Sequence, residues 1–254
     1  MSETIGIVVV ATNAYFPLGV RFIRRFHHFY TGSRDIRYYF FSDIDPTHYL
    51  PDDMDVRYTS THHDSWVDAT NSKFTNIVSI DDDVDYLYYF DADTLVSRPF
   101  DEEWFLGDLV GGEHYGNRGY EAQGATAYPF ERNDISSCYI PLDTDRDMMY
   151  YYGAFFGGRK DRVMDFCLEL IKNQEKDREI PYEPGVNDES YINHYFHYNP
   201  PKVVFSKDFA FGISCKGGMG ETRDANLDIT QLVNDLKLHK GKLFNINKGH
   251  IIYE

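Results

Sequence analysis

Two aspartates at the end of an apolar segment give the clearest chemical signal in this sequence. The run YLYYF at residues 86–90 is followed directly by Asp91, Ala92 and Asp93. Acids at positions i and i+2, where a strand gives way to a loop, can turn their oxygens toward one point, and hard divalent cations prefer oxygen ligands. Mg²⁺ or Mn²⁺ in such a place also takes phosphate oxygens from a ligand. The pair is therefore a candidate site for a nucleotide diphosphate.

The Asp-x-Asp pattern alone fits two classes of enzyme. In phosphatases of the haloacid dehalogenase type the first aspartate is a nucleophile, a role that Asp91 would take, and the motif usually lies on the first strand. In nucleotide-sugar glycosyltransferases of the GT-A fold the motif lies well inside the chain, after a nucleotide-binding half. About 90 residues precede Asp91, and this position favours the transferase.

The segments before the motif predict the sheet that positions it. Short β-branched or aromatic runs indicate strands, and apolar residues at helical spacing indicate helices, one of them capped by Asp64 or Ser65. The predicted strands are 5–12, 36–43, 54–58 and 86–90, and the predicted helices are 15–30 and 66–80. This order predicts an α/β fold with a mostly parallel sheet, which binds ligands outside the carboxyl ends of its strands.

The second half of the chain is less regular and contains another acidic pair. The predicted elements are a strand at 148–158, helices at 161–173 and 188–197, and a strand at 202–206. Asp188 and Glu189 open the second of these helices. On spacing alone, the helix dipole accounts for two acids in a first turn.

The composition of the 254 residues excludes several classes of protein. A formal net charge of -16 argues against binding nucleic acid through phosphate neutralisation. The three cysteines, Cys138, Cys167 and Cys215, lie too far apart to indicate a zinc site or a disulfide framework. No segment approaches the roughly 20 apolar residues of a transmembrane span, and the N-terminus does not resemble a signal peptide. We expect a cytoplasmic protein.

Five segments carry a resemblance to a known family. They are VVATNAYF (9–16), SWVDATNSKF (65–74), FERNDISSCYIP (130–141), YYYGAFFGG (150–158) and NDESYINHYF (187–196). The last three, in their order and spacing, resemble motifs of glycosyltransferase family 6, which includes the retaining ABO blood-group transferases. The resemblance implies one GT-A catalytic domain over residues 1–254, with 1–95 mainly binding the nucleotide and 96–254 mainly the acceptor. Because the vertebrate membrane anchor is missing, a compact bacterial or viral type is expected.

The resemblance implies a UDP-sugar donor site. The residues that it places around uracil, ribose and diphosphate are Val10, Ala11, Thr12, Tyr15, Trp66, Asp68, Lys73 and Lys248. It implies a bound Mn²⁺ or Mg²⁺ on Asp91 and Asp93, with Ala92 between them in the donor site.

The same resemblance assigns the reacting end of the donor. Tyr152, Gly153 and Ala154 match positions that select the donor sugar, where Ala favours galactose and Gly leaves room for an N-acetyl group. Asp188 is implied to contact hydroxyls of the donor sugar.

Glu189 is implied to be catalytic, beneath the anomeric carbon, and also to help bind the acceptor, as does His114. Retention requires either a carboxylate nucleophile in a double displacement or attack from the same face, and the sequence leaves both open. The family's Trp-His before the acidic pair is replaced by Val186-Asn187, so the acceptor site is altered.

These inferences lead to one main hypothesis and three alternatives. The main hypothesis is metal-dependent transfer of galactose, or N-acetylgalactosamine, from UDP to a hydroxyl of a glycan or glycolipid, with retention and an α-1,3 linkage. The alternatives are a glycogenin-like family 8 transferase, whose C-terminal His-x-x-Gly-x-x-Lys-Pro-Trp segment we do not find, the phosphatase using Asp91, and a relic that binds sugars without transferring them.

Overall fold

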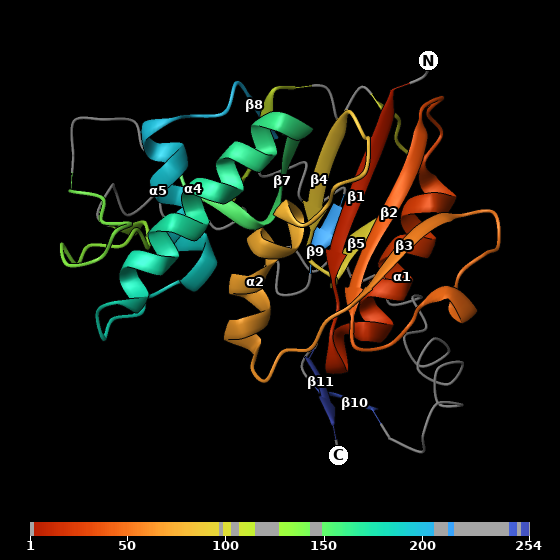
Figure 1. Cartoon of the computed structure of the whole chain (residues 1–254), viewed down its shortest axis with the longest axis horizontal. Coiled ribbons are helices and arrows are strands. Elements are labelled where there is room, and N and C mark those ends of the chain that lie inside the picture. The colour runs from red at the N-terminus through yellow and green to blue at the C-terminus, as the bar shows by residue number, and fades with distance from the viewer. Residues whose placement is uncertain are drawn as a thin grey trace.

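The computed structural model is built around a seven-stranded mixed sheet (Figure 1). It describes residues 3–96, 99–102, 107–114, 127–142, 149–205, 213–215, 244–247 and 250–253. The strand order is β3-β2-β1-β4-β7-β6-β8. The strands are β1 (Thr4–Val10), β2 (Asp35–Ser42), β3 (Asp55–Ser60), β4 (Tyr86–Phe90), β6 (Leu109–Glu113), β7 (Tyr151–Arg159) and β8 (Val203–Phe205).

Four of the neighbouring strand pairs are parallel, and the two pairs that include β7 are antiparallel. The predicted α/β fold with a mostly parallel sheet is therefore confirmed. Two short two-stranded sheets lie outside it: β5 (Thr94–Val96) with β9 (Ile213–Cys215), and β10 (Phe244–Asn247) with β11 (His250–Tyr253). The β10–β11 hairpin lies near the carboxyl end of β1, beside the 3₁₀ turn η1 (Asn13–Tyr15) (Figure 1).

Helices cover both faces of the sheet. One face packs against α1 (Phe16–Phe29), and the other against α2 (Trp66–Val78), α4 (Lys160–Arg178) and α5 (Asn187–Tyr198). The alternation along β1 explains the two layers, because Ile7 and Val9 join the core beneath α1, whereas Val8 and Val10 join the core beneath α2 and α4. Among the described residues, no helix is long and apolar enough to cross a membrane.

Strand β7 brings the second half of the chain beside the Asp-x-Asp motif. Gly157 lies opposite Tyr88 on β4, and a Cβ added there would overlap the tyrosine ring and lie 2.6 Å from the Leu87 carbonyl oxygen. Glycine is therefore needed for the close approach. The register continues to the end of β4, where the Asp91 N–H donates to the Ala154 carbonyl at 3.0 Å.

Helix α4 is longer than the sequence predicted, because it continues past Asn173 to Arg178. The last turns are polar, so apolar residues at helical spacing do not reveal them in the sequence. One side of these turns is nevertheless buried: the Gln174 amide donates to Asn71 on α2 at 3.2 Å, and the Asp177 carboxylate accepts three hydrogen bonds. The predicted strand at 148–158 begins at Tyr151, and residues 143–148 lie outside the described ranges.

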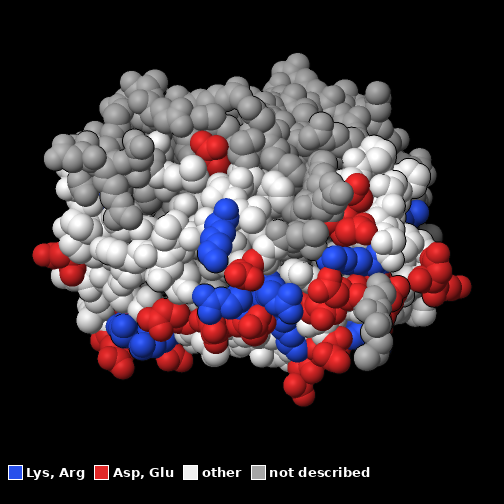
Figure 2. Space-filling view, turned by 90° about the horizontal axis from the view of Figure 1, so that it is seen from above, with Lys and Arg blue, Asp and Glu red and all other residues white. Residues whose placement is uncertain are grey.

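Acidic and basic side chains lie next to one another along one edge of the molecule (Figure 2). Arg37 on β2 pairs with Asp55 on the edge strand β3 at 2.7 Å and with Asp82, in the segment before β4, at 3.5 Å. Such partly exposed pairs contribute little to stability.

Candidate active site

Lys73 lies at the centre of a buried cluster of charges. Its side chain on α2 is 1% exposed, and its Nζ lies 2.6 Å from Asp188 Oδ2 and 3.4 Å from Asp91 Oδ1. The ammonium also donates to the Gly153 carbonyl at 3.1 Å. Burial alone would lower the pKa of Lys73, but the carboxylates of Asp188 and Asp91 outweigh it and raise the pKa. The structure thus brings four of the predicted site residues together, each from a different segment.

Asp91 is held from a second side by Tyr89, two residues earlier in the chain. The Tyr89 hydroxyl donates to Asp91 Oδ1 at 2.7 Å, and the Lys73 Nζ lies 4.6 Å from the centre of the Tyr89 ring. Sequence reasoning missed Tyr89, although the signal was present. Residues i and i+2 of a strand point to the same face, so the tyrosine two positions before Asp91 was placed to reach it.

Glu189 is fixed against β7 by a backbone donor. Its Oε2 accepts the Gly153 N–H at 2.7 Å. A Cβ at Gly153 would lie 3.1 Å from Glu189 Oε2 and 3.2 Å from Asp188 Oδ2, so glycine leaves the space that the two carboxylates occupy. Burial raises the pKa of Glu189 to about 7, although the hydrogen bond from Gly153 partly offsets this effect. Near neutral pH, Glu189 can therefore exist in either protonation state.

Tyr15 and Arg21 lie near Asp93, the second acid of the motif. Burial, followed by the charges of Asp93 and Asp91, raises the pKa of Tyr15 to about 12, which places the tyrosine within the field of both acids. Arg21 on α1, 9% exposed, donates to the backbone carbonyl of Asp93 at 3.5 Å and was not predicted from the sequence. Tyr15, Arg21 and Lys73 therefore all lie near one or both acids of the motif.

The turn at Asp91 and Asp93 offers carboxylate oxygens, which are suitable ligands for a divalent cation. The Thr94 N–H closes the turn by donating to the Asp91 carbonyl at 3.0 Å. Within the described ranges, no group of three or more His, Cys, Asp or Glu side chains is arranged to hold a metal ion. An ion at this turn would need further oxygens from a ligand and from water, as Mg²⁺ typically does. The two carboxylates fit that kind of site.

The residues predicted to hold uracil are buried at the end of β1. Val10, Ala11 and Thr12 are 8%, 0% and 5% exposed. The Ala11 N–H donates to the Phe41 carbonyl at 2.8 Å, and the Ala11 carbonyl accepts from the Ser42 hydroxyl at 2.6 Å. Both backbone groups of Ala11 are thus used within the sheet and its adjoining turn.

Trp66 and Asp68 lie on different sides of α2. Trp66, 58% exposed, begins the helix seven residues before Lys73, so the two side chains share one side. Asp68 belongs to the helix cap, because its N–H donates to the Ser65 hydroxyl, which in turn donates to its carboxylate at 2.7 Å. Asp68 therefore lies away from the Lys73 cluster.

His114 packs against Tyr152 at the beginning of β7. The centres of their rings lie 5.2 Å apart, and the His114 N–H donates to the Tyr150 carbonyl at 2.9 Å. Burial lowers the pKa of His114 to about 4, so the imidazole is neutral at physiological pH. Ala92 is buried at 3% exposure, and Lys248 lies outside the described residues.

A mixed sheet with an acidic cluster where β4 ends is consistent with a glycosyltransferase of the GT-A type. The family model of glycosyltransferase family 6 matches residues 1–218. The chain therefore belongs to glycosyltransferase family 6. The match favours family 6 over the two alternatives, a family 8 transferase and a phosphatase.

Sequence similarity to characterised glycosyltransferases supports the same family. The chain is 28% identical over 219 residues to globoside alpha-1,3-N-acetylgalactosaminyltransferase 1 of Mus musculus, covering 82% of this chain and 61% of the relative. It is 27% identical over 175 residues to the O-antigen biosynthesis glycosyltransferase WbnI of Escherichia coli, covering 66% and 71%. It is 28% identical over 228 residues to histo-blood group ABO system transferase 2 of Rattus norvegicus, covering 82% and 63%. The chain thus spans less than two thirds of the length of the mouse and rat relatives.

Proposed function

We propose that this glycosyltransferase moves galactose, or N-acetylgalactosamine, from UDP to a hydroxyl of a glycan or glycolipid, with retention of the α configuration and formation of an α-1,3 linkage. The main support is the placement of Glu189, whose carboxylate is fixed by the Gly153 N–H beside the Lys73–Asp188 pair. A carboxylate so held, with a pKa near 7, is suited to act where positive charge develops on a sugar.

In the proposed transfer, the bond between the anomeric carbon and the diphosphate breaks, and its electron pair leaves with UDP. The acceptor oxygen bonds to the anomeric carbon, and its proton passes to the leaving diphosphate or to water. Glu189 stabilises the positive charge, either through a transient covalent bond or electrostatically. Asp188, oriented by Lys73, accepts hydrogen bonds from hydroxyls of the donor sugar.

The proposal includes a metal requirement. Asp91 and Asp93 would hold Mn²⁺ or Mg²⁺, which when bound would neutralise charge on the diphosphate. Chelation with EDTA should abolish transfer, and added Mn²⁺ should restore it. Metal content would be checked by elemental analysis. Full turnover in EDTA by metal-free protein would show that Asp91 and Asp93 do not act through a bound metal.

The proposed role of Ala154 in selecting the donor sugar can be tested with a single substitution. Ala154 is 4% exposed and its carbonyl accepts the Asp91 N–H, so the residue lies at the edge of the acidic cluster. Ala154→Gly should raise the ratio of kcat/KM for UDP-N-acetylgalactosamine over that for UDP-galactose. The name of the mouse relative includes N-acetylgalactosamine, so both donors belong in the assay. An unchanged ratio would show that Ala154 does not select the sugar.

The main experiment is a transfer assay with both donors, Mn²⁺ and a panel of neutral oligosaccharide acceptors. Product analysis by NMR would give the anomeric configuration and the linkage. Binding of UDP-sugars without transfer to any acceptor would favour the sugar-binding relic over the transferase. An inverted product would contradict the assignment of Glu189.

A further inference from the structure

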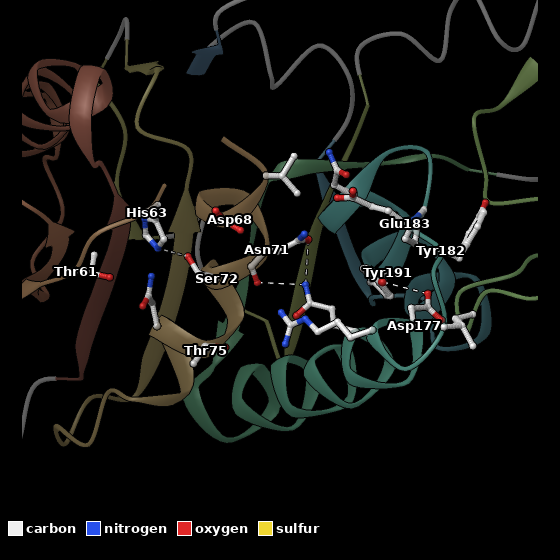
Figure 3. Close-up of a pocket in the computed structure, with 17 residues that line it drawn as sticks. Thr61, His63, Asp68, Asn71, Ser72, Thr75, Asp177, Tyr182, Glu183 and Tyr191 are labelled. Carbon is white, nitrogen blue, oxygen red and sulfur yellow. Dashed lines mark hydrogen bonds between the residues drawn. The ribbon is translucent and has the colours of Figure 1, made fainter. Parts of the chain in front are cut away.

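A buried histidine joins the end of β1 to helix α2. His63 lies in the segment between β3 and α2 and is 7% exposed. Its Nδ1 lies 3.1 Å from the Thr12 hydroxyl oxygen, and its Nε2 lies 2.6 Å from the Ser72 hydroxyl oxygen, a contact that Figure 3 shows. Ser72 immediately precedes Lys73 on α2, and Thr12 is one of the residues expected around the nucleoside of the donor. The sequence did not point to His63.

The backbone of His63 holds the next residue of the same turn. The Asn13 side-chain amide donates to the His63 carbonyl at 3.0 Å, and the Asn13 N–H donates to the Asp43 carboxylate at 2.8 Å. Asn13 has a φ of 54°, in the left-handed region that asparagine tolerates better than most residues. His63 therefore holds two successive residues of the segment that leads from β1 to Tyr15, one through its ring and one through its carbonyl.

The hydrogen bonds around His63 fix which atoms carry the protons. The Ser72 hydroxyl lies 3.1 Å from the Ala69 carbonyl, which can only accept. Because a hydroxyl has one proton, Ser72 gives it to Ala69, and His63 Nε2 donates to the Ser72 oxygen. Burial lowers the pKa of His63, so its ring is neutral at physiological pH and has no second proton. Nδ1 therefore accepts, and the Thr12 hydroxyl donates to it.

This arrangement determines what Thr12 can offer to a ligand. With its proton bonded to His63, the Thr12 oxygen has only lone pairs left and can only accept further hydrogen bonds. A uridine carries groups that donate, namely the imide N–H of its base and the hydroxyls of its ribose. The state of the His63 ring thus suits Thr12 to a nucleoside of this kind.

The His63 ring also separates Thr12 from a cavity on the outer side of α2. This outer cavity has a volume of about 570 Å³ and lies between α2, the end of α4 and the segment before α5 (Figure 3). His63 and Ser72 line it at one end, whereas Thr12 is not among its lining residues. The ring therefore forms a wall between the cavity and the end of β1.

We propose that His63 is a positioning residue of the donor site, which holds Thr12 and Asn13 in place at the nucleoside end and keeps the Thr12 oxygen as an acceptor. The inference rests on the proposed UDP-sugar donor and adds a residue to the site of its nucleoside. His63 acts through Thr12, so the contact at Nδ1 should matter for binding of UDP, whereas the contact at Nε2 should matter only for stability.

Two substitutions separate the contacts of the ring. In His63→Asn the amide is attached to Cγ, as Nδ1 is, so its oxygen can accept the Thr12 proton but the side chain no longer reaches Ser72. In His63→Gln the amide lies one atom farther out, as Nε2 does, so the contact with Ser72 is kept and that with Thr12 is lost. His62→Gln makes the same change at the exposed neighbouring position and is the control.

Binding of UDP in the presence of Mn²⁺ is measured by calorimetry. His63→Gln should bind UDP about tenfold more weakly than the wild type, as expected for one lost hydrogen bond, whereas His63→Asn and His62→Gln should stay within about threefold. Pyrophosphate with Mn²⁺ lacks the nucleoside and should bind equally to all four proteins. Thermal unfolding should show similar decreases in Tm for the two His63 variants, because each keeps one of the two ring contacts. Equal losses of UDP affinity in both variants would indicate a merely structural role and overturn the proposal.

A double-mutant cycle tests whether the effect passes through Thr12. Thr12→Val removes the hydroxyl with little change of shape, so adding His63→Gln to it should cause no further loss of UDP affinity. Additive losses, or wild-type affinity in His63→Gln, would overturn the role of His63 and leave the UDP donor intact. A wild type that binds pyrophosphate but no UDP would instead overturn the proposed donor, and the role of His63 with it.

Discussion

Two buried carboxylates of this protein are compensated in different ways. Asp177 on α4 is 2% exposed and accepts hydrogen bonds from the Ser136 hydroxyl at 2.8 Å, the Ser137 N–H at 2.6 Å and the Tyr191 hydroxyl at 3.1 Å. Asp188 on α5 is 6% exposed and is paired with the ammonium of Lys73 at 2.6 Å. Neutral donors surround the first acid, and a buried cation compensates the second.

The difference indicates two roles. Neutral donors hold Asp177 in place and thereby tie the segment containing Ser136 to α4, which is a structural task. A buried ion pair is a poor way to gain stability, because desolvation offsets much of its attraction. Its presence at Asp188, together with Asp91 and Glu189, is better explained by a site that must present charge to a ligand.

The largest effect is expected from Lys73→Met, which leaves Asp188 and Asp91 without their buried cation. Removing one partner of a buried pair typically costs about 3–5 kcal/mol, and transfer should be lost with it. Urea unfolding at several pH values measures the first effect, and the deficit should shrink in acid as the carboxylates become protonated. Lys172→Met, in an exposed pair with Glu169, should change little. A Lys73→Met protein as stable as the wild type at neutral pH would contradict the ion pair.

Glu189→Gln should reduce activity without the same loss of stability. The amide keeps the shape of the side chain and can still accept the Gly153 N–H through its oxygen. Removing a group that stabilises transition-state charge typically costs about 100- to 1000-fold in kcat. Steady-state kinetics and UDP binding by calorimetry would separate chemistry from donor binding. Wild-type turnover by Glu189→Gln would remove Glu189 from the reaction.

Asp177 and Asp188 can each be replaced by asparagine, which gives a matched pair of variants. Asp177→Asn brings an NH₂ group among three donors, so we expect a loss of about 1–3 kcal/mol in the free energy of unfolding and little change in kcat. Asp188→Asn should instead reduce transfer strongly. Thermal unfolding and kinetics on both variants measure the contrast. If both variants lose activity equally, the division into structural and functional acids is wrong.

Much of this architecture could be predicted from the sequence because it is encoded locally. The strand 86–90, the Ser65 cap and the glycines opposite β4 leave signals within a few residues of themselves. The similarity to family motifs also pointed to Lys73, Asp91, Gly153, Asp188 and Glu189, which the structure brings together.

Contacts between distant segments could not be predicted. Arg21 reaches the carbonyl of Asp93 across 72 positions of the chain, and no periodicity records such a pairing. The outer cavity is a similar case, because α2, α4 and the segment before α5 create it only when packed together. The end of α4 was missed because its buried residues are polar, so burial there follows from hydrogen bonding rather than from apolar spacing.

The smallest effect concerns the pH dependence that Glu189 introduces. Burial raises its pKa from the ordinary 4.5 to about 7, so the folded chain holds this proton more tightly than the unfolded chain. Its contribution to stability is therefore present below about pH 4.5 and is lost as the pH rises to about 7. His114, whose pKa burial lowers to about 4, acts in the opposite direction in an overlapping range. The informative quantity is thus the difference between the wild type and Glu189→Gln, which should favour the wild type at low pH and decrease toward pH 7.

Activity should follow the opposite trend if Glu189 acts in its ionised form. In the wild type, kcat/KM should rise about tenfold between pH 6 and pH 8, as expected for an essential base with a pKa near 7. The residual activity of Glu189→Gln should lack this rise. Because kcat/KM reports the free enzyme, the comparison is made at low donor concentration, before UDP alters the surroundings of the carboxylate. A flat profile for the wild type would show that the hydrogen bond from Gly153, rather than burial, controls the ionisation of Glu189, and the contrast with Asp177 would then rest on Lys73 and Asp188 alone.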